Sequence, residues 1–178
     1  MSTPSFAFPP YYQLPPFFTL QRFEETLSKQ LQMWELLIIS YCKSHHMSHI
    51  DLRTADEMEL FHNKTIKRQL SFSDLQKIID YLVSKGHASW DDEEKTQALI
   101  MWKTKEEWIS YISKWVSDNG QKGTAHTLHA FVTEGEPGVE DLIGLDEKIL
   151  ASVFEAMQDQ GLCVMKKDRQ GKIGVLFK

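Results

Sequence analysis

Two histidine pairs have the residue spacing of a metal site. His45 with His49 and His126 with His129 stand four and three residues apart, so each pair would share one helix face. A catalytic zinc also needs a third ligand and a general base, and neither pair lies in a His-Glu-x-x-His frame. We therefore interpret these histidines as polar residues near helix ends, where the helix dipole favours a cation.

The sequence lacks the motifs of nucleophilic and phosphoryl-transfer enzymes. It contains no glycine-rich phosphate loop and no Gly-x-Ser-x-Gly elbow. Cys42 lies in an apolar helical run, where burial would penalise a thiolate, and Cys163 is distant from it in sequence. Two such cysteines are typical of reduced core residues in an intracellular protein. We predict that the chain is not an enzyme and uses no metal or other cofactor.

The composition indicates a globular protein that is poorly suited to nucleic acid. The chain has 178 residues, of which 42% are hydrophobic, enough for one or two domains with a buried core. Its formal net charge is -5, which opposes binding to a phosphate backbone. The N-terminus has no secretory pattern, and the longest apolar run, Leu36 to Ile39, is too short to cross a bilayer. We expect a cytoplasmic protein.

A proline- and aromatic-rich arm over residues 1–20 carries the clearest signal for binding. It contains Pro15-Pro16-Phe17-Phe18 and a looser copy, Pro9-Pro10-Tyr11-Tyr12. Proline fixes φ and removes a backbone donor, so we expect an extended, polyproline-like arm. Each ring gains roughly 1.5–3 kcal/mol when it leaves water, so the rings need a pocket. The arm either folds back on its own domain or inserts its rings into another protein, and the pattern favours insertion.

An internal repeat predicts the architecture of the rest of the chain. Each copy has a polar N-cap, an amphipathic helix, a glycine that ends the helix, and two strands joined by a polar turn. The first copy uses Ser71 and Gly86, and the second uses Asp146 and Gly161 at matching positions. We expect strands over residues 86–90, 97–102, 162–165 and 172–177.

Helices precede each copy, and this order is that of a winged helix. A helix from Leu27 to Tyr41 and short helices around 56–61 and 64–69 come before the first copy. Helices over 106–116 and 127–131 come before the last helix. The predicted fold is α+β and mainly helical, with two tandem winged-helix domains, residues 21–102 and 103–178, behind the extended arm over residues 1–20.

Tandem winged helices suggest nucleic acid, but the charges argue against it. A winged helix that reads DNA needs cations on its longest helix and on its wing. The first wing turn carries four consecutive carboxylates, Asp91 to Glu94, and the last helix is acidic. Only the second wing, residues 166–172, is basic. A nucleic-acid-binding or transcription-associated protein remains the alternative, which salt-dependent binding to random duplex would reveal.

Several stretches of the sequence are similar to one known family. They are Pro-Pro-Phe-Phe-Thr-Leu-Gln at 15–21, Gln-Leu-x-x-Trp at 30–34, Leu-Ile-Met-Trp at 99–102, Glu-Glu-Trp at 106–108 and Gly-Leu-Asp-Glu at 144–147. Through them the chain resembles the small tandem winged-helix subunit of ESCRT-II, the vacuolar protein sorting-associated protein twenty-five family. The resemblance covers essentially the whole chain. The copy at residues 9–12 also matches a Pro-Pro-x-Tyr ligand of WW domains.

The resemblance implies a structural adaptor in the endosomal sorting of ubiquitinated membrane proteins into multivesicular bodies. Two copies of such a chain join two larger ESCRT-II subunits, one copy of each. The proline-aromatic box enters hydrophobic pockets in the winged helices of those subunits. The residues so implied are Pro15, Pro16, Phe17 and Phe18, with Tyr11 and Tyr12 as a second contact.

The resemblance also implies a role for the second winged helix. It would recruit and activate an initiating ESCRT-III subunit by holding that subunit's N-terminal amphipathic helix. The expected surface contains His126, Thr127, Leu128, Phe131, Glu147 and Glu155, although His126 replaces a larger apolar or aromatic group. We expect recruitment to endosomal membranes through the complex, with no direct binding of nucleic acid, membrane or ubiquitin by this chain.

Overall fold

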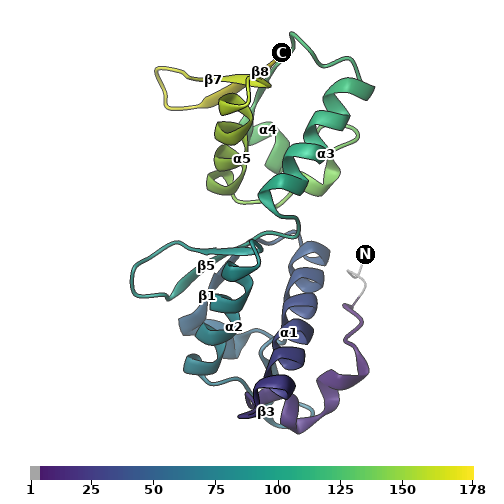
Figure 1. Ribbon diagram of the computed structural model, residues 1–178, viewed down its shortest axis with the longest axis vertical. Helices are drawn as coiled ribbons and strands as arrows, with labels where there is room; N and C mark the ends of the chain where they lie inside the picture. Colours follow the sequence, from purple (N-terminus) through teal and green to yellow (C-terminus); the bar gives the residue numbers. More distant parts are fainter. Residues whose placement is uncertain (1–4) are drawn as a thin grey trace. The chain divides into compact units, whose positions relative to one another are not determined.

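Two helices and an antiparallel sheet form the first of two units into which the chain divides (Figure 1). The structure is a computed structural model that describes residues 5–178, so the first four residues of the predicted arm lie outside it. The first unit comprises the chain up to His45 and His49–Trp102, and the second comprises His46–Ser48 and Lys103–Lys178.

The first unit is built on helix α1 (Glu24–Ser44), which packs against helix α2 (Phe72–Ser84). Trp34 and Ile38 of α1 and Ile78 of α2 are completely buried, so the predicted apolar stripes do form the core. A three-stranded antiparallel sheet follows the order β1–β5–β4. Its strands are β1 (His49–Asp51), β4 (Ala88–Trp90) and β5 (Gln97–Ile100).

The segment between β1 and α2 differs from the expectation of two short α-helices. It contains the 3-10 helix η3 (Leu52–Glu57) and then a hairpin of β2 (His62–Asn63) and β3 (Arg68–Gln69). The side-chain oxygen of Asn63 accepts a hydrogen bond from the Thr65 amide at 3.1 Å. This local bond starts a turn where a helix would need the amide for itself. The helix prediction for residues 64–69 is therefore wrong.

The arm turns twice where an extended conformation was expected. Its 3-10 helices are η1 (Pro10–Gln13) and η2 (Pro15–Phe18), and each begins with a proline. At the first position of a helical turn the fixed φ of proline fits, and its missing N–H is not needed. The turns bring the aromatic rings onto α1, where Phe17 stacks on Trp34. Figure 1 shows the backbone of the arm in purple beside α1.

The second unit repeats this plan and also has an aromatic core. Helix α3 (Lys105–Asp118) begins with a capping box between Thr104 and Glu107. Trp108, Phe131 and Phe154 are completely buried. The remaining elements are α4 (Leu128–Thr133), η4 (Glu140–Leu142), α5 (Glu147–Asp159) and a sheet in the order β6–β8–β7, with strands β6 (Ala125–Thr127), β7 (Cys163–Lys167) and β8 (Ile173–Phe177).

The predicted repeat is present in both units. Each sheet places its last strand between the other two, and each hairpin strand lies within about two residues of its expected bounds. Gly86 and Gly161 end the corresponding helices with φ of 80° and 74°. The third strand of each sheet, β1 or β6, has only three residues. β1 lies in a segment, residues 47–52, for which the sequence predicts a loop with some β character, whereas β6 was not predicted.

Substitutions at Gly161 test whether the left-handed backbone is the reason that the repeat has a glycine at this position. A Cβ at Gly161 would meet no atom within 4 Å, so only the left-handed backbone opposes a side chain. We predict that Gly161→Ala lowers the free energy of unfolding by about 1–2 kcal/mol. Gly161→Asn should cost less, because asparagine tolerates this conformation better.

Urea unfolding followed by tryptophan fluorescence would measure both variants. The matched control is Gln160→Ala at the exposed neighbouring residue, which should leave the midpoint unchanged. Equal stability of the alanine and wild-type chains would contradict a backbone origin for this glycine.

Candidate functional site

The rings of the proline-aromatic box lie in the core of the first unit. The Phe17 ring stacks on Trp34 with centroids 4.1 Å apart, and the Phe18 ring meets the same indole edge-on at 5.6 Å. Phe17 is 5% exposed and Phe18 is 2% exposed. In this structure the rings, which the resemblance implies enter another protein, fill their own domain, as in the other interpretation of the arm sequence.

A buried glutamine on α1 fixes the backbone of the arm. The Gln30 side-chain amide donates to the carbonyl oxygens of Phe17 and Thr19, both at 3.0 Å, and its oxygen accepts from the Gln21 amide at 3.0 Å. The Trp34 indole N–H also donates to the Phe17 carbonyl, at 3.1 Å. The Gln-Leu-x-x-Trp stretch carried the family resemblance, but its role in holding the arm was not predicted from sequence.

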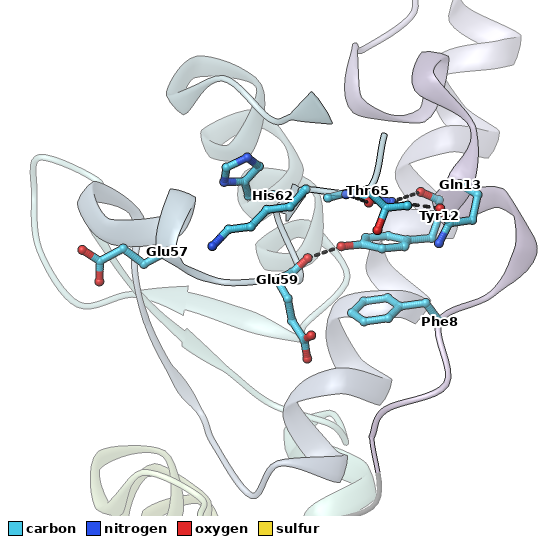
Figure 2. Close-up of a pocket in the computed structure, with 9 residues that line it drawn as sticks. Phe8, Tyr12, Gln13, Glu57, Glu59, His62 and Thr65 are labelled. Carbon is cyan, nitrogen blue, oxygen red and sulfur yellow. Dashed lines mark hydrogen bonds between the residues drawn. The ribbon is translucent and has the colours of Figure 1, made fainter. Parts of the chain in front are cut away.

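The tyrosine copy of the box is also attached to this unit (Figure 2). The Tyr12 hydroxyl donates to the Glu59 carbonyl, and Phe8 stacks on the Tyr12 ring with centroids 4.0 Å apart. Burial, aided by the Glu59 charge, raises the pKa of Tyr12 to about 12. Tyr11 is half-buried against Phe17. Because the Tyr12 ring is buried, the Pro-Pro-x-Tyr pattern is not presented as a free WW-domain ligand.

The outer side of the arm leaves an apolar surface beside α1. A cavity of about 360 Å³ lies here, with Leu14 and Pro16 on the arm side and Met33 on the helix side. Leu14 is 57% exposed, and Phe23 at the start of α1 is 81% exposed. We call the surface formed by Leu14, Pro15, Pro16, Phe23 and Met33 the arm surface; Pro15 and Pro16 are exposed and Met33 is half-buried.

Two of the six residues expected to bind a partner on the second unit belong to its core. Phe131 is completely buried and packs against Trp115 and Phe154. The His126 side chain is only 9% exposed, and its two ring nitrogens lie 3.1 Å from a Glu136 carboxylate oxygen and 3.0 Å from the Gln121 amide oxygen. These two residues shape the unit from within and do not offer side chains to a partner.

Three others come together at a cavity of about 380 Å³ that we call the wing cavity. Thr127, Leu128 and Glu147 line it, together with His129 and the wing segment 170–173. His129 Nδ1 lies 2.7 Å from a Glu147 carboxylate oxygen. Glu155 is exposed on α5 but does not line this cavity. The wing segment was missed because the pairing of β6 with β8, which sets it beside α4, has no clear sequence signal.

The candidate chemical residues are occupied in structural contacts. Among residues 5–178, no group of three or more His, Cys, Asp or Glu side chains could hold a metal ion. His45 stacks on Tyr41 at 4.0 Å, and burial raises the pKa of the Cys42 thiol to about 12. In the same part of the chain, no helix is both long and apolar enough to span a membrane.

Comparison with known proteins identifies relatives over nearly the full length. Residues 11–146 match the model of the family described as ESCRT-II complex subunit. Vacuolar protein-sorting-associated protein 25 of Xenopus laevis is 38% identical over 155 residues, 87% of this chain and 89% of the relative. The protein of the same name from Danio rerio is 37% identical over 97% of this chain and 99% of its own length.

Solved structures of such proteins share the fold. A crystal structure of subunit VPS25 of the endosomal trafficking complex ESCRT-II aligns with a TM-score of 0.81 at 24% identity, over 96% of this chain and 98% of that one. A chain in the endosomal ESCRT-II complex of VPS22, VPS25 and VPS36 aligns with a TM-score of 0.77 at 25% identity, over 93% and 96%. The predicted tandem winged-helix fold and the family resemblance are confirmed.

The position of the arm rings predicts the effect of removing them. Phe17→Ala with Phe18→Ala should lower the free energy of unfolding of the first unit by at least about 3 kcal/mol, because each change empties a buried site. The control is Pro15→Ala with Pro16→Ala, which alters exposed residues of the same turn and should cost less than about 1 kcal/mol.

Urea unfolding monitored by the near-ultraviolet signal of the tryptophans would compare the two double variants. If the phenylalanine variant unfolded at the wild-type urea concentration, the rings would not be part of the core.

Proposed function

This chain belongs to the ESCRT-II complex subunit family, and from that membership we propose how it assembles and what it recruits. It is a vacuolar protein-sorting subunit of an endosomal trafficking complex. In our proposal it acts without catalysis, as an adaptor in sorting ubiquitinated membrane proteins into multivesicular bodies. Two copies join two larger subunits, and the complex brings the cytoplasmic chain to the endosomal membrane.

The arm surface is the proposed contact with the larger subunits. The observation that carries this proposal is the exposure of Leu14 at an apolar cavity, with a second exposed apolar side chain, Phe23, at the start of α1. Burying a large apolar side chain in a partner contributes roughly 1.5–3 kcal/mol, and isolated patches of this kind mark protein contacts. In this proposal the buried rings of Phe17 and Phe18 do not contact the partner; their packing in the core holds the prolines and Leu14 in position.

The anchoring of the arm supports a preorganised contact. Gln30 and Trp34 together bond the backbone of the box, so the arm does not have to be ordered when a partner arrives. Ordering a flexible segment on binding reduces the affinity, because the lost conformational entropy opposes the contact. Here the arm is already ordered when the domain folds. We therefore assign Pro15 and Pro16 to the contact itself and Phe17 and Phe18 to its support.

The wing cavity is the proposed site for the N-terminal amphipathic helix of an initiating ESCRT-III subunit. Leu128 contributes apolar lining, and Glu147 and His129 stand at the cavity with exposed side chains. Glu155 adds negative charge further along α5. A basic residue of an amphipathic helix would pair with Glu147, whereas Lys172 of the wing, which lines the same cavity, would oppose a basic residue. Complementary charge of this kind steers encounter and sets register.

Assembly tests the arm surface. Leu14→Asp with Phe23→Asp should remove this chain from the complex formed on co-expression with the two larger ESCRT-II subunits, as measured by native mass. Aspartate suits the Phe23 position, because Phe23 is the N-cap of α1 and makes no side-chain capping bond. The matched control is Leu36→Asp, because Leu36 lies on α1 outside the arm surface and is 64% exposed.

For wild type and for the control, we expect the native mass of a complex that contains two copies of this chain. Loss of this chain in the double variant, with an unchanged unfolding midpoint, supports the proposal. Full assembly of the double variant would overturn the assignment of the arm surface.

Charge at the wing cavity gives a second test. Glu147→Gln should weaken binding of a peptide with the N-terminal helix of the ESCRT-III subunit by about three- to tenfold, equal to about 0.7–1.4 kcal/mol. Glu155→Gln removes the same charge from α5 outside the cavity and should have a smaller effect. Calorimetry with the full chain would measure both, and equal effects would show that general charge, not the cavity, selects the peptide.

A further inference from the structure

A second cavity in the second unit lies away from both proposed contacts. It has a volume of about 220 Å³ and lies between the C-terminal half of α3 and the ends of α5 and β8. The wing cavity uses the other ends of two of these elements, Glu147 of α5 and Ile173 of β8. We call the second site the C-terminal cavity; its lining residues are Ser113, Val116, Ser117, Lys122, Met157, Leu162, Phe177 and Lys178.

Four of the eight residues that line the C-terminal cavity are apolar, and the backbone around them is fixed by hydrogen bonds. Met157 and Phe177 are 1% exposed, and Val116 is also buried. The backbone holds the site on two sides, because the Gly123 amide donates to the Phe177 carbonyl at 2.8 Å and the Lys178 amide donates to the Leu162 carbonyl at 3.0 Å. Such walls favour an apolar group that leaves water.

Two lysines and two serines supply the polar side chains at the site. Lys122 and Lys178 are exposed, and within residues 5–178 neither ammonium forms an ion pair. The nearby Asp118 of α3 is already bonded by Lys114. The buried Ser113 hydroxyl also has no hydrogen-bond partner in the described part of the chain. Two free cations around an apolar recess favour a ligand that combines an apolar group with negative charge.

We propose that the C-terminal cavity binds an acidic peptide segment of a partner protein through one large apolar side chain. An apolar cavity of about 150 Å³ is large enough for benzene, so this site holds one such side chain with a little room to spare. Carboxylates beside that side chain would pair with Lys122 and Lys178. The proposal concerns a surface separate from the arm surface and the wing cavity, and it does not rest on their functions.

The test uses the full chain and a defined probe. The probe is the acetylated and amidated pentapeptide Asp-Glu-Phe-Glu-Asp, titrated while the methyl signals of Val116, Met157 and Leu162 are followed by NMR. The comparison peptides replace the phenylalanine by alanine or the four acidic residues by lysine. Octanoate, an anionic amphiphile of similar chemistry that is not a peptide, is titrated in the same way.

Two test variants and one control show whether the probe binds in this cavity. Lys122→Gln with Lys178→Gln should lower the affinity for the probe at least fivefold. Lys166→Gln with Lys167→Gln, a matched pair on the wing, should leave that affinity unchanged. Ser117→Leu at the exposed rim should block the recess and reduce binding without touching a charge.

The expected result is saturable movement of the methyl signals of Val116, Met157 and Leu162 with the acidic phenylalanine peptide alone. Equal binding of the alanine or lysine peptide would overturn the proposal, because either the apolar anchor or the charge would then be dispensable. Binding of octanoate without binding of the peptide would overturn it in favour of a small amphiphile. Unchanged signals in every titration would also refute it.

Discussion

The stacking of Phe17 on Trp34 is the contact on which the first unit and its proposed surface depend. It brings an arm from the start of the chain onto α1, and the Gln30 amide then satisfies carbonyls that the turn would otherwise leave unpaired. A buried polar group is tolerable only when its hydrogen bonds are made, so ring and amide have to act together. The prolines and Leu14 are held outward as a consequence.

The same arrangement changes the meaning of a proline-aromatic box. Such a box is commonly regarded as a linear ligand that supplies its rings to a partner. Here the rings belong to the domain, and the surface available for a partner is made of prolines and neighbouring apolar side chains. The arm surface is thus part of a folded domain, and its shape will depend on the stability of the first unit.

The second unit separates support from contact in a similar way. Phe131 and His126 were expected to meet a partner, but they pack among aromatic rings. Their neighbours Thr127 and Leu128 remain at the wing cavity. Glu147 of α5 and Lys172 of the wing line the wing cavity, whereas Lys122, which follows α3, and Lys178, which follows β8, line the C-terminal cavity. One small domain therefore offers two recesses with different charge preferences.

The repeated helix–glycine–hairpin unit could be predicted from the amino-acid sequence, because helix caps, apolar periodicity and left-handed glycines are local properties. Gly86, Gly161 and the hairpin strands all follow from it. Only the tertiary structure decided where the rings of the arm point, and that segment 64–69 turns instead of forming a helix. The position of the rings depends on Trp34 and Gln30, and a contact between residues distant in sequence leaves no period in it. The turn depends on the side-chain bond of Asn63 and on the pairing of the two-residue strands β2 and β3, which apolar periodicity does not reveal.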